Sequence, residues 1–432
     1  MKIVFLTAGT GSYYCGACMR DNALARELHR VGDEVTIAPM YLPLTLDETS
    51  LAGADQVPVF FGGISVFLQQ KLALFRRTPA FIDRLLNSAG LLRWAARHSH
   101  MTSARTHGEM TLEMLCVGSS RLGKELEKLL SWLQHSEKPD VVCLSNALFA
   151  GFAAPLKKRL GAPVVTFFQG EDGFLDGLPE PYRSKCWAAL AEQLPASDLL
   201  LAPSRYYAGY MRERLHLAEN AVEVVHNGIQ LDGYSTAPTP PTPPAIGYLA
   251  RMCREKGVEV LVDTFIFLAR KLGDATTRLH IAGAATAGDE RLIAELQRRL
   301  ATAGLTSRVA WTPNLTREQK IEFLRGLTLF SVPAIYAEAF GLYVIEAMAC
   351  GVPVVQPDSA AFTEIIAETG GGVCVPPRDA AALARAWQQL LGDPARRQAL
   401  GQAGRLGVEK RFTARTMGEQ FRQAAWRVCK KC

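Results

Sequence analysis

The chain lacks long apolar runs and the familiar signatures of hydrolytic enzymes. No uninterrupted apolar stretch of membrane-spanning length occurs, and the opening run MKIVFLT is far too short for a signal peptide. Neither an H-E-x-x-H pair nor a Ser-His-Asp arrangement can be recognised, which argues against a zinc protease and a serine hydrolase. We therefore expect a cytoplasmic protein with a different chemistry.

Cysteine is scarce for the length, with 10 residues in 432. So few cysteines do not form a disulfide framework, and some, such as Cys143 in VVCLS, lie inside apolar runs as small hydrophobic residues. A reducing compartment follows from this usage. The 48% hydrophobic content is typical of a globular chain, and the length predicts two or three domains.

Short apolar strands alternate with helical patterns along most of the chain. This alternation predicts an α/β fold with parallel sheets covered by helices on both faces, and with functional side chains at the carboxyl ends of the strands. The segment 235–244, STAPTPPTPP, has five prolines and reads as a stiff linker between two such domains. We therefore predict an N-terminal domain at 1–234 with an insertion at about 60–118, the linker at 235–244, a C-terminal domain at 245–412, and a final helix and tail at 413–432.

The stretch from Glu338 to Val355, EAFGLYVIEAMACGVPVV, carries the strongest functional pattern. Its two acids, Glu338 and Glu346, flank a glycine that leads from a loop into a short predicted helix at 343–349. Free N–H groups at such a helix start favour a phosphate, and a carboxylate beside it can accept hydrogen bonds from sugar hydroxyls. The alternative is that Glu338 is a solvated loop residue and Glu346 a first-turn acid interacting with the helix dipole.

These residues resemble the donor site of the retaining GT-B glycosyltransferases of family 4. The resemblance implies two Rossmann-like domains facing a cleft, with a final helix that crosses back to the first domain. It also implies that Glu338 faces the donor sugar and Glu346 holds the ribose of a UDP- or GDP-linked sugar. The remaining donor-binding residues implied by the stretch are Phe340, Gly341 and Leu342.

A second part of the resemblance lies in GYLARMCREKG, where Arg251 and Lys256 keep the spacing of the family's diphosphate clamp although Ala250 replaces a glycine. A salt-bridged surface pair is the alternative interpretation. The chain has no Asp-x-Asp pair, the usual carboxylate ligand for a divalent cation on a diphosphate. We therefore predict sugar transfer without a divalent cation, with Arg251, Lys256 and Glu338 as the catalytic group.

The first domain offers weaker candidates for the acceptor side of the site. Gly11 lies in a glycine loop after the first strand, and Asn22 either lines the cleft or caps the following helix. Gln169 and Glu171 follow a later strand in the loop QGEDGFLDG. The family usually has a histidine-glycine pair at Gln169, so this departure puts the acceptor chemistry in doubt.

The segment from Val66 to Arg105 has seven basic residues and one acid, so it alone accounts for the +6 net charge of the chain. Interleaved apolar residues make it either a basic amphipathic face for an anionic lipid or acceptor, or a helical insertion with solvated arginines. The first interpretation predicts peripheral contact with the inner face of a membrane. Nucleic acid is not expected as a partner, because no aromatic stacking motif accompanies the basic residues.

Each end of the chain carries a C-x-x-C pair: Cys15 with Cys18, and Cys429 with Cys432. If the final helix returns to the first domain, the pairs can meet, and four thiolates suit zinc or an iron-sulfur cluster. A redox disulfide and four unconnected thiols are the alternatives.

The sequence as a whole predicts a hexosyltransferase that moves a sugar from a nucleotide sugar to a small-molecule, glycan or lipid-linked acceptor. Two other functions stay open. One is a nucleotide-sugar 2-epimerase of the same fold, and the other is a nucleotide-sugar or glycan-binding protein without catalysis.

Overall fold

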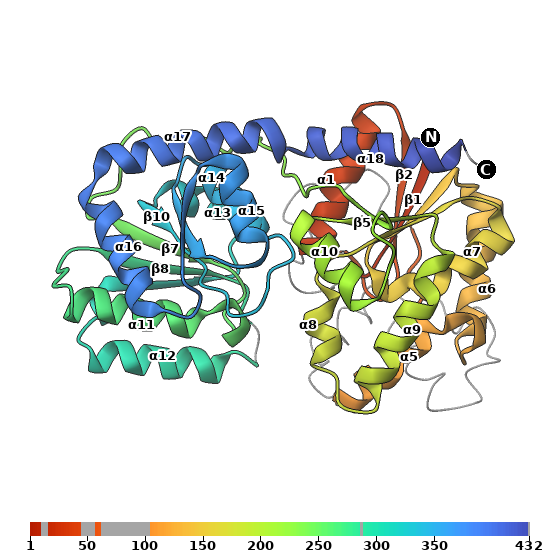
Figure 1. Cartoon of the computed structure of the whole chain (residues 1–432), viewed down its shortest axis with the longest axis horizontal. Helices are drawn as coiled ribbons and strands as arrows, with labels where there is room; N and C mark the ends of the chain where they lie inside the picture. Colours follow the sequence, from red (N-terminus) through yellow and green to blue (C-terminus); the bar gives the residue numbers. More distant parts are fainter. Residues whose placement is uncertain (10–15, 45–56, 62–103, 286–287, 431–432) are drawn as a thin grey trace. The chain divides into compact units, whose positions relative to one another are not determined.

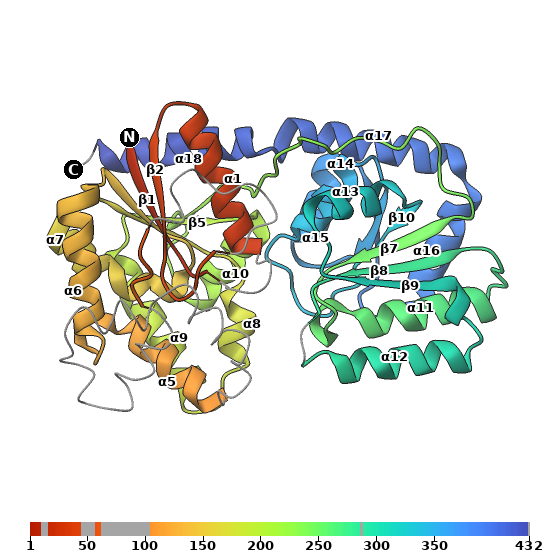
Figure 2. The ribbon, with the colours of Figure 1, turned by 180° about the vertical axis from the view of Figure 1, so that it is seen from behind.

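The computed structural model describes residues 1–9, 16–44, 57–61, 104–285 and 288–430. The chain divides into two compact units (Figures 1 and 2). Unit 1 comprises Met1–His226 together with Met417–Cys432, and unit 2 comprises Asn227–Thr416. The division falls ahead of the proline-rich segment 235–244, which lies within unit 2.

Unit 1 is built on a six-stranded parallel sheet in the order β2-β1-β3-β4-β5-β6. The central strands are buried apolar runs of the kind that parallel sheets require. The strands are β1 (Lys2–Thr7), β2 (Glu34–Pro39), β3 (Val141–Leu144), β4 (Val164–Phe167), β5 (Leu199–Ala202) and β6 (Val222–Val224).

Helices cover both faces of the unit 1 sheet. Alternate residues of β1 separate the two faces: Val4 and Leu6 belong to one core cluster, whereas Phe5 packs against a helix on the other side. The helices are α1 (Gly16–Arg30), α5 (Ala104–Leu115), η4 (Val117–Ser119), α6 (Gly123–Trp132), η5 (Leu133–Glu137), η6 (Ala147–Phe152), α7 (Ala153–Leu160), α8 (Glu171–Asp176), α9 (Tyr182–Gln193), η7 (Leu194–Ala196), α10 (Arg205–Arg214) and α18 (Ala414–Cys429).

The last helix, α18, packs on unit 1, as the resemblance implied (Figure 1). Its Phe421 is fully buried, and its ring centroid lies 5.9 Å from that of Phe5 and 5.8 Å from that of Phe167. Arg422 forms an ion pair with Asp33 at 2.9 Å. The final helix therefore supplies core to a sheet whose strands all lie at least 190 residues earlier in the chain.

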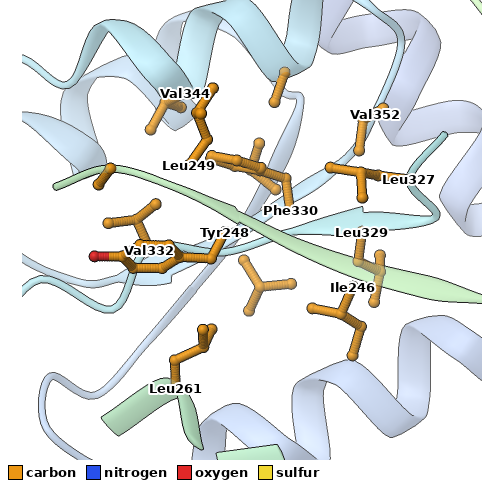
Figure 3. Close-up of a cluster of buried hydrophobic side chains, with 14 of the residues drawn as sticks. Ile246, Tyr248, Leu249, Leu261, Leu327, Leu329, Phe330, Val332, Val344 and Val352 are labelled. Carbon is orange, nitrogen blue, oxygen red and sulfur yellow. The ribbon is translucent and has the colours of Figure 1, made fainter. Parts of the chain in front are cut away.

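Unit 2 repeats the architecture with the order β12-β11-β10-β7-β8-β9, again all parallel. Its core lies around Tyr248 and Phe330 in the middle of the sheet (Figure 3). The strands are β7 (Ala245–Leu249), β8 (Arg278–Gly283), β9 (Val309–Pro313), β10 (Leu329–Phe330), β11 (Val354–Pro357) and β12 (Gly372–Val375).

The helices of unit 2 also lie on both faces of its sheet, with α11, α12 and α16 on one side and α13, α14, α15 and α17 on the other (Figures 1 and 2). Their bounds are η8 (Arg254–Lys256), α11 (Val258–Arg270), α12 (Glu290–Thr302), η9 (Thr306–Arg308), α13 (Arg317–Arg325), α14 (Leu342–Ala349), α15 (Ala360–Thr369), α16 (Ala380–Gly392) and α17 (Pro394–Arg411).

The structure differs from the sequence-based expectation in two places. The segment QGEDGFLDG is not wholly a loop, because α8 begins at Glu171. Strand β12 was not predicted; its half-exposed GVCV run is short and follows two glycines. The basic segment 66–105 falls almost entirely outside the described residues. Within the described ranges, no helix has the length and apolar character needed to cross a membrane.

Candidate active site

The loops that follow β7 and β10 carry the predicted donor-site residues. These two strands are neighbours in the unit 2 sheet, so their carboxyl ends lie side by side. The first loop supplies Lys256, and the second supplies Glu338. Their side chains form an ion pair, with the Lys256 ammonium donating to Glu338 Oε1. Lys256 is therefore salt-bridged, as the alternative interpretation supposed, but its partner Glu338 is buried.

A close approach at a glycine and two backbone hydrogen bonds hold these two loops together. Gly257 has φ +72°, and a Cβ there would overlap the carbonyl oxygen of Pro333. On the other side of Lys256, the Glu255 carbonyl accepts hydrogen bonds from Ile335 N at 3.0 Å and Tyr336 N at 3.4 Å. The close approach that brings Lys256 to Glu338 therefore requires glycine at position 257.

Tyr343 completes the surroundings of Glu338. Its hydroxyl donates to Glu338 Oε1 at 2.7 Å, so Lys256 and Tyr343 share one oxygen of the carboxylate. Burial, and then the charge of Glu338, raise the pKa of Tyr343 well above its usual range, which keeps the phenol protonated as a donor. No described residue donates a hydrogen bond to the second oxygen, Oε2, of Glu338.

Glu346 has a parallel environment. It is the fifth residue of α14, so the interpretation as a first-turn acid is wrong. Its Oε1 accepts hydrogen bonds from Lys320 Nζ at 2.6 Å and from Tyr234 Oη at 3.0 Å. Its Oε2, like that of Glu338, receives no hydrogen bond from the described residues. Both acids are thus held through one oxygen by a lysine and a tyrosine.

The helix start between the two acids is formed by Gly341, the residue before α14. Gly341 has φ +94°, and a Cβ there would lie 2.9 Å from the Phe362 ring. Leu342 begins the helix and is partly buried. Phe340 packs into the core, 5.7 Å from the Phe412 ring, so its side chain is structural. The sequence predicted an anion at the first N–H groups of α14, and of these Val344 N already donates to the Gly341 carbonyl at 3.0 Å.

Arg251 lies in the β7 loop with its side chain about half exposed and paired to Asp289. The two pairs of atoms, Nε–Oδ2 and Nη2–Oδ1, are 3.4 and 3.3 Å apart. Asp289 is buried beside the start of α12. Arg251 thus takes part in a partly exposed salt bridge, which is the alternative interpretation considered for this segment.

The acceptor-side candidates of unit 1 lie around the start of α8. Glu171 is buried and accepts hydrogen bonds from Ala147 N at 2.7 Å, Gln169 N at 2.8 Å and the Tyr207 hydroxyl at 3.3 Å. Burial raises the pKa of Glu171 above its ordinary value. Glu171 therefore ties the Gln169 loop to the loop after β3.

The other two acceptor-side candidates belong to the first βα connection. Asn22 is buried in the middle of α1, so it does not cap that helix. Gly11 lies outside the described residues. Two residues near Asn22 were not predicted: Arg20 and Asp21 form a fully buried ion pair at 3.0 Å, with Arg20 also donating to the Ser145 carbonyl. This pair fixes α1 to the carboxyl edge of the sheet.

The described cysteines of the two C-x-x-C pairs lie at opposite edges of the unit 1 sheet. Cys18 is in the first turn of α1, at the carboxyl edge, whereas Cys429 Sγ lies 3.8 Å from the Asp140 carbonyl, before β3 begins. The four residues of β3, about 13 Å, separate these edges. The structure therefore does not bring Cys18 and Cys429 together. Cys15 and Cys432 lie outside the described residues, and no metal-binding group of three or more side chains occurs among those that are described.

Sequence reasoning missed the partners of the two acids. Tyr343 lies inside the predicted stretch, five residues after Glu338, and its place in the first helical turn was a usable signal. Lys320 and Tyr234 are 26 and 112 residues from Glu346, and no local spacing links them to it. Only the tertiary fold places them.

Two family models match the chain. The model described as "Glycosyltransferase Family 4" matches residues 117–232, and the model "Glycosyl transferases group 1" matches residues 236–407. A relative, alpha-maltose-1-phosphate synthase from Mycobacterium tuberculosis, is 30% identical over 270 residues, covering 57% of this chain and 67% of the relative. The chain belongs to glycosyltransferase family 4. Its two Rossmann-like units and returning helix are the GT-B fold of that family.

Other relatives match over a shorter length. Phosphatidyl-myo-inositol mannosyltransferase from Mycobacterium leprae is 32% identical over 199 residues, which is 45% of this chain and 50% of that protein. The matched region thus spans half to two thirds of these curated relatives.

Solved structures share the fold at lower identity. Sucrose-phosphate synthase from Thermosynechococcus elongatus has a TM-score of 0.74 at 18% identity, covering 100% of this chain and 99% of that one. Anabaena HepE in complex with UDP has a TM-score of 0.68 at 16% identity, covering 98% of this chain and 99% of that one. These likenesses concern the fold of family 4 and not the substrate.

Proposed function

We propose that this protein is a hexosyltransferase that moves a sugar from a UDP- or GDP-linked donor to an acceptor with retention of configuration. The observation that carries the proposal is the state of the two acids in unit 2. Glu338 and Glu346 are buried, each is held at Oε1 by a lysine and a tyrosine, and each has an oxygen that the described residues leave without a hydrogen bond. Two such oxygens on either side of a helix start suit a glycosyl phosphate and its ribose.

Each residue has a distinct role in the proposed donor complex. Glu346 Oε2 accepts from the ribose hydroxyls, and Glu338 Oε2 accepts from hydroxyls of the sugar that is transferred. The diphosphate lies near the start of α14, where backbone N–H groups and the Lys256 ammonium stabilise the charge that develops as the nucleoside diphosphate leaves. Arg251 adds a second cation after it turns away from Asp289. No divalent cation is required at the diphosphate in this arrangement.

The step itself breaks the bond between the sugar's anomeric carbon and the diphosphate oxygen and forms a bond to an acceptor hydroxyl. Retention follows if the acceptor attacks from the side on which the phosphate departs, and the leaving phosphate then takes the acceptor's proton. The family pattern favours this front-side route. In this proposal Glu338 is not a nucleophile, because Oε2 accepts hydrogen bonds from the sugar hydroxyls while Lys256 and Tyr343 engage Oε1.

The acceptor is proposed at the class level only. Relatives named for phosphatidyl-myo-inositol and for D-inositol 3-phosphate favour a polyol or a lipid-linked acceptor. The basic segment 66–105 would suit an anionic lipid surface. Peripheral membrane contact therefore belongs to the proposal.

One alternative is favoured by a specific residue. Gln169 stands where the family usually has histidine, and an amide cannot transfer a proton at neutral pH. A protein that binds nucleotide sugars without turnover is the function that this substitution favours.

Incubation with UDP- and GDP-sugars tests the proposal. Binding is measured by calorimetry, and hydrolysis, epimerisation and transfer to a panel of polyol and lipid acceptors are followed separately. We expect binding of one nucleotide sugar, slow hydrolysis without acceptor, and transfer with the right acceptor. Epimerisation without acceptor identifies the 2-epimerase, binding without turnover identifies the non-catalytic alternative, and absence of binding at millimolar concentrations overturns the proposal.

A further inference from the structure

Three elements that are distant in the sequence converge on a single atom, Glu346 Oε1. Lys320 reaches it from α13 at 2.6 Å, Tyr234 reaches it from the segment before β7 at 3.0 Å, and Glu346 itself stands on α14. The side chains of Lys320 and Glu346 are only 12% and 9% exposed. A charge pair with so little water contact fixes the direction of the carboxylate much more firmly than a surface pair does.

Tyr234 is held as firmly as Lys320. Its backbone carbonyl accepts a hydrogen bond from Arg405 at 3.3 Å, and the Arg317 guanidinium lies 5.3 Å from its ring centroid. Burial, and then the charge of Glu346, raise the pKa of Tyr234 well above its usual range, so the phenol remains a donor. Lys320 follows the capping box that Thr316 and Gln319 form at the start of α13.

The consequence for Glu346 is an asymmetric carboxylate. With Oε1 receiving two hydrogen bonds, rotation of the carboxylate would break both of them. The described residues offer no hydrogen bond to Oε2 that would compensate for such a rotation. The geometry therefore selects one oxygen for any incoming ligand.

We propose that Lys320 and Tyr234 are positioning residues that hold Glu346 so that Oε2 recognises the two hydroxyls of the nucleotide ribose. This inference rests on the proposed function, because it assumes that a nucleotide binds beside α14. It adds two residues to the donor site that lie outside the stretch 338–355 and outside the Arg251–Lys256 segment.

The separate arrangement at Glu338 makes the inference specific. That acid has its own lysine and tyrosine, Lys256 and Tyr343. Loss of Lys320 should therefore affect recognition of the ribose alone, whereas loss of Lys256 should weaken binding of the diphosphate and leave ribose recognition intact.

The experiment compares two ligands with and without ribose hydroxyls. Dissociation constants are measured for UDP and for 2′,3′-dideoxyuridine diphosphate, and likewise for the guanosine pair. We expect the wild-type protein to prefer the hydroxylated ligand of one pair by about tenfold to a hundredfold, the range of one charged hydrogen bond. In Lys320→Met and in Glu346→Gln this ratio should fall to about one. Tyr234→Phe should lower it by at least threefold, and Lys320→Arg should keep most of it.

Two control variants separate positioning from general damage. Lys256→Met should lower the affinity for both ligands with the ratio unchanged. Lys271→Met carries the same substitution on an exposed lysine after the end of α11, at the opposite edge of the sheet, and should change neither constant. If Lys320→Met does not fold because Glu346 is left as an unpaired buried charge, the double variant Lys320→Met/Glu346→Gln removes that charge and should fold.

The outcomes distinguish this inference from the proposed function. If neither UDP nor GDP binds the wild-type protein, the proposed function fails. If one binds with a clear preference for ribose hydroxyls, and that preference survives in both Lys320→Met and Tyr234→Phe, the positioning role is wrong while the donor site stands.

Discussion

The Lys256 ammonium donates to Glu338 Oε1 across 82 residues of sequence, and the same oxygen accepts the Tyr343 hydroxyl. One cation is thereby shared between an acid that is proposed to face the sugar and a helix start that is proposed to bind the diphosphate. This sharing separates the role of Glu338 from that of Glu346, whose lysine comes from a different helix.

Alanine at the two acids should therefore give different kinetic effects. We expect Glu346→Ala mainly to raise the KM for the donor, because a ribose contact is equally strong in the ground state and the transition state. Glu338→Ala should mainly lower kcat, by about a hundredfold to a thousandfold, because the sugar contact strengthens as the bond breaks. Steady-state kinetics with the identified donor measure KM and kcat for each variant. Wild-type values in both variants would contradict the assignment of the two acids to the donor site.

Chelation should leave the activity intact. Lys256, Arg251 and the N–H groups of α14 are proposed to meet the diphosphate charge, so excess EDTA should reduce the rate less than twofold. The measurement is donor turnover with and without EDTA. Complete loss that magnesium or manganese restores would show that the basic residues do not suffice.

Gly341→Ala should weaken both the fold and donor binding. The residue has φ +94°, which costs about 1–2 kcal/mol for an L-residue, and the new Cβ would press on the Phe362 ring at 2.9 Å. Gly32→Ala is the matched control, because Gly32 has φ +92° and no atom within 4 Å of the added Cβ. Thermal unfolding should show a loss in both variants, larger at Gly341, and nucleotide affinity should fall only at Gly341.

The buried Glu171 should make stability depend on pH in a defined direction. Burial raises the pKa of Glu171 in the folded state, so the native protein holds its proton at pH values where the unfolded chain has released it. The contribution of Glu171 is therefore most favourable below the unfolded pKa and is lost as pH rises through the folded value.

Glu171→Gln isolates that contribution. The free energy of unfolding of the wild type minus that of the variant should decrease as the pH is raised from about 4.5 to 8. Urea denaturation at each pH measures both free energies. A difference that grows with pH would contradict the raised pKa.

Phe421→Ala should destabilise unit 1 by about 3–5 kcal/mol, since it opens a cavity between α18 and the rings of Phe5 and Phe167. Trp426 is on the same helix but 46% exposed, so Trp426→Ala is the control and should cost far less. Equal losses in the two variants would mean that α18 does not contribute core.

Much of this architecture follows from the sequence, because buried parallel strands are apolar runs and the glycines mark the turns between them. The helix predicted at 343–349 differs from α14 by one residue. The acids of the donor site were also apparent, since Glu338 and Glu346 lie in one contiguous motif.

Pairings between distant segments could not be predicted in the same way. Lys320 is the single lysine of α13, but nothing within that helix marks it as a partner of Glu346 before β9 and β10 bring α13 and α14 together. For the two C-x-x-C pairs, only the described members Cys18 and Cys429 can be compared. Their matching spacing at the two chain ends suggested proximity, but α1 starts at the carboxyl edge of the sheet and α18 ends at the amino edge.

The return of α18 to the first sheet also governs the order of events on the ribosome. Residues 1–226 emerge first, yet the ring of Phe421 that covers Phe5 and Phe167 is synthesised about 200 residues later. At a translation rate of about 5–20 residues per second, the apolar face formed by Phe5 and Phe167 stays without Phe421 for about 10–40 s. The second unit can complete its own core in that interval, so we expect the first unit to finish folding after the second, although it is synthesised first.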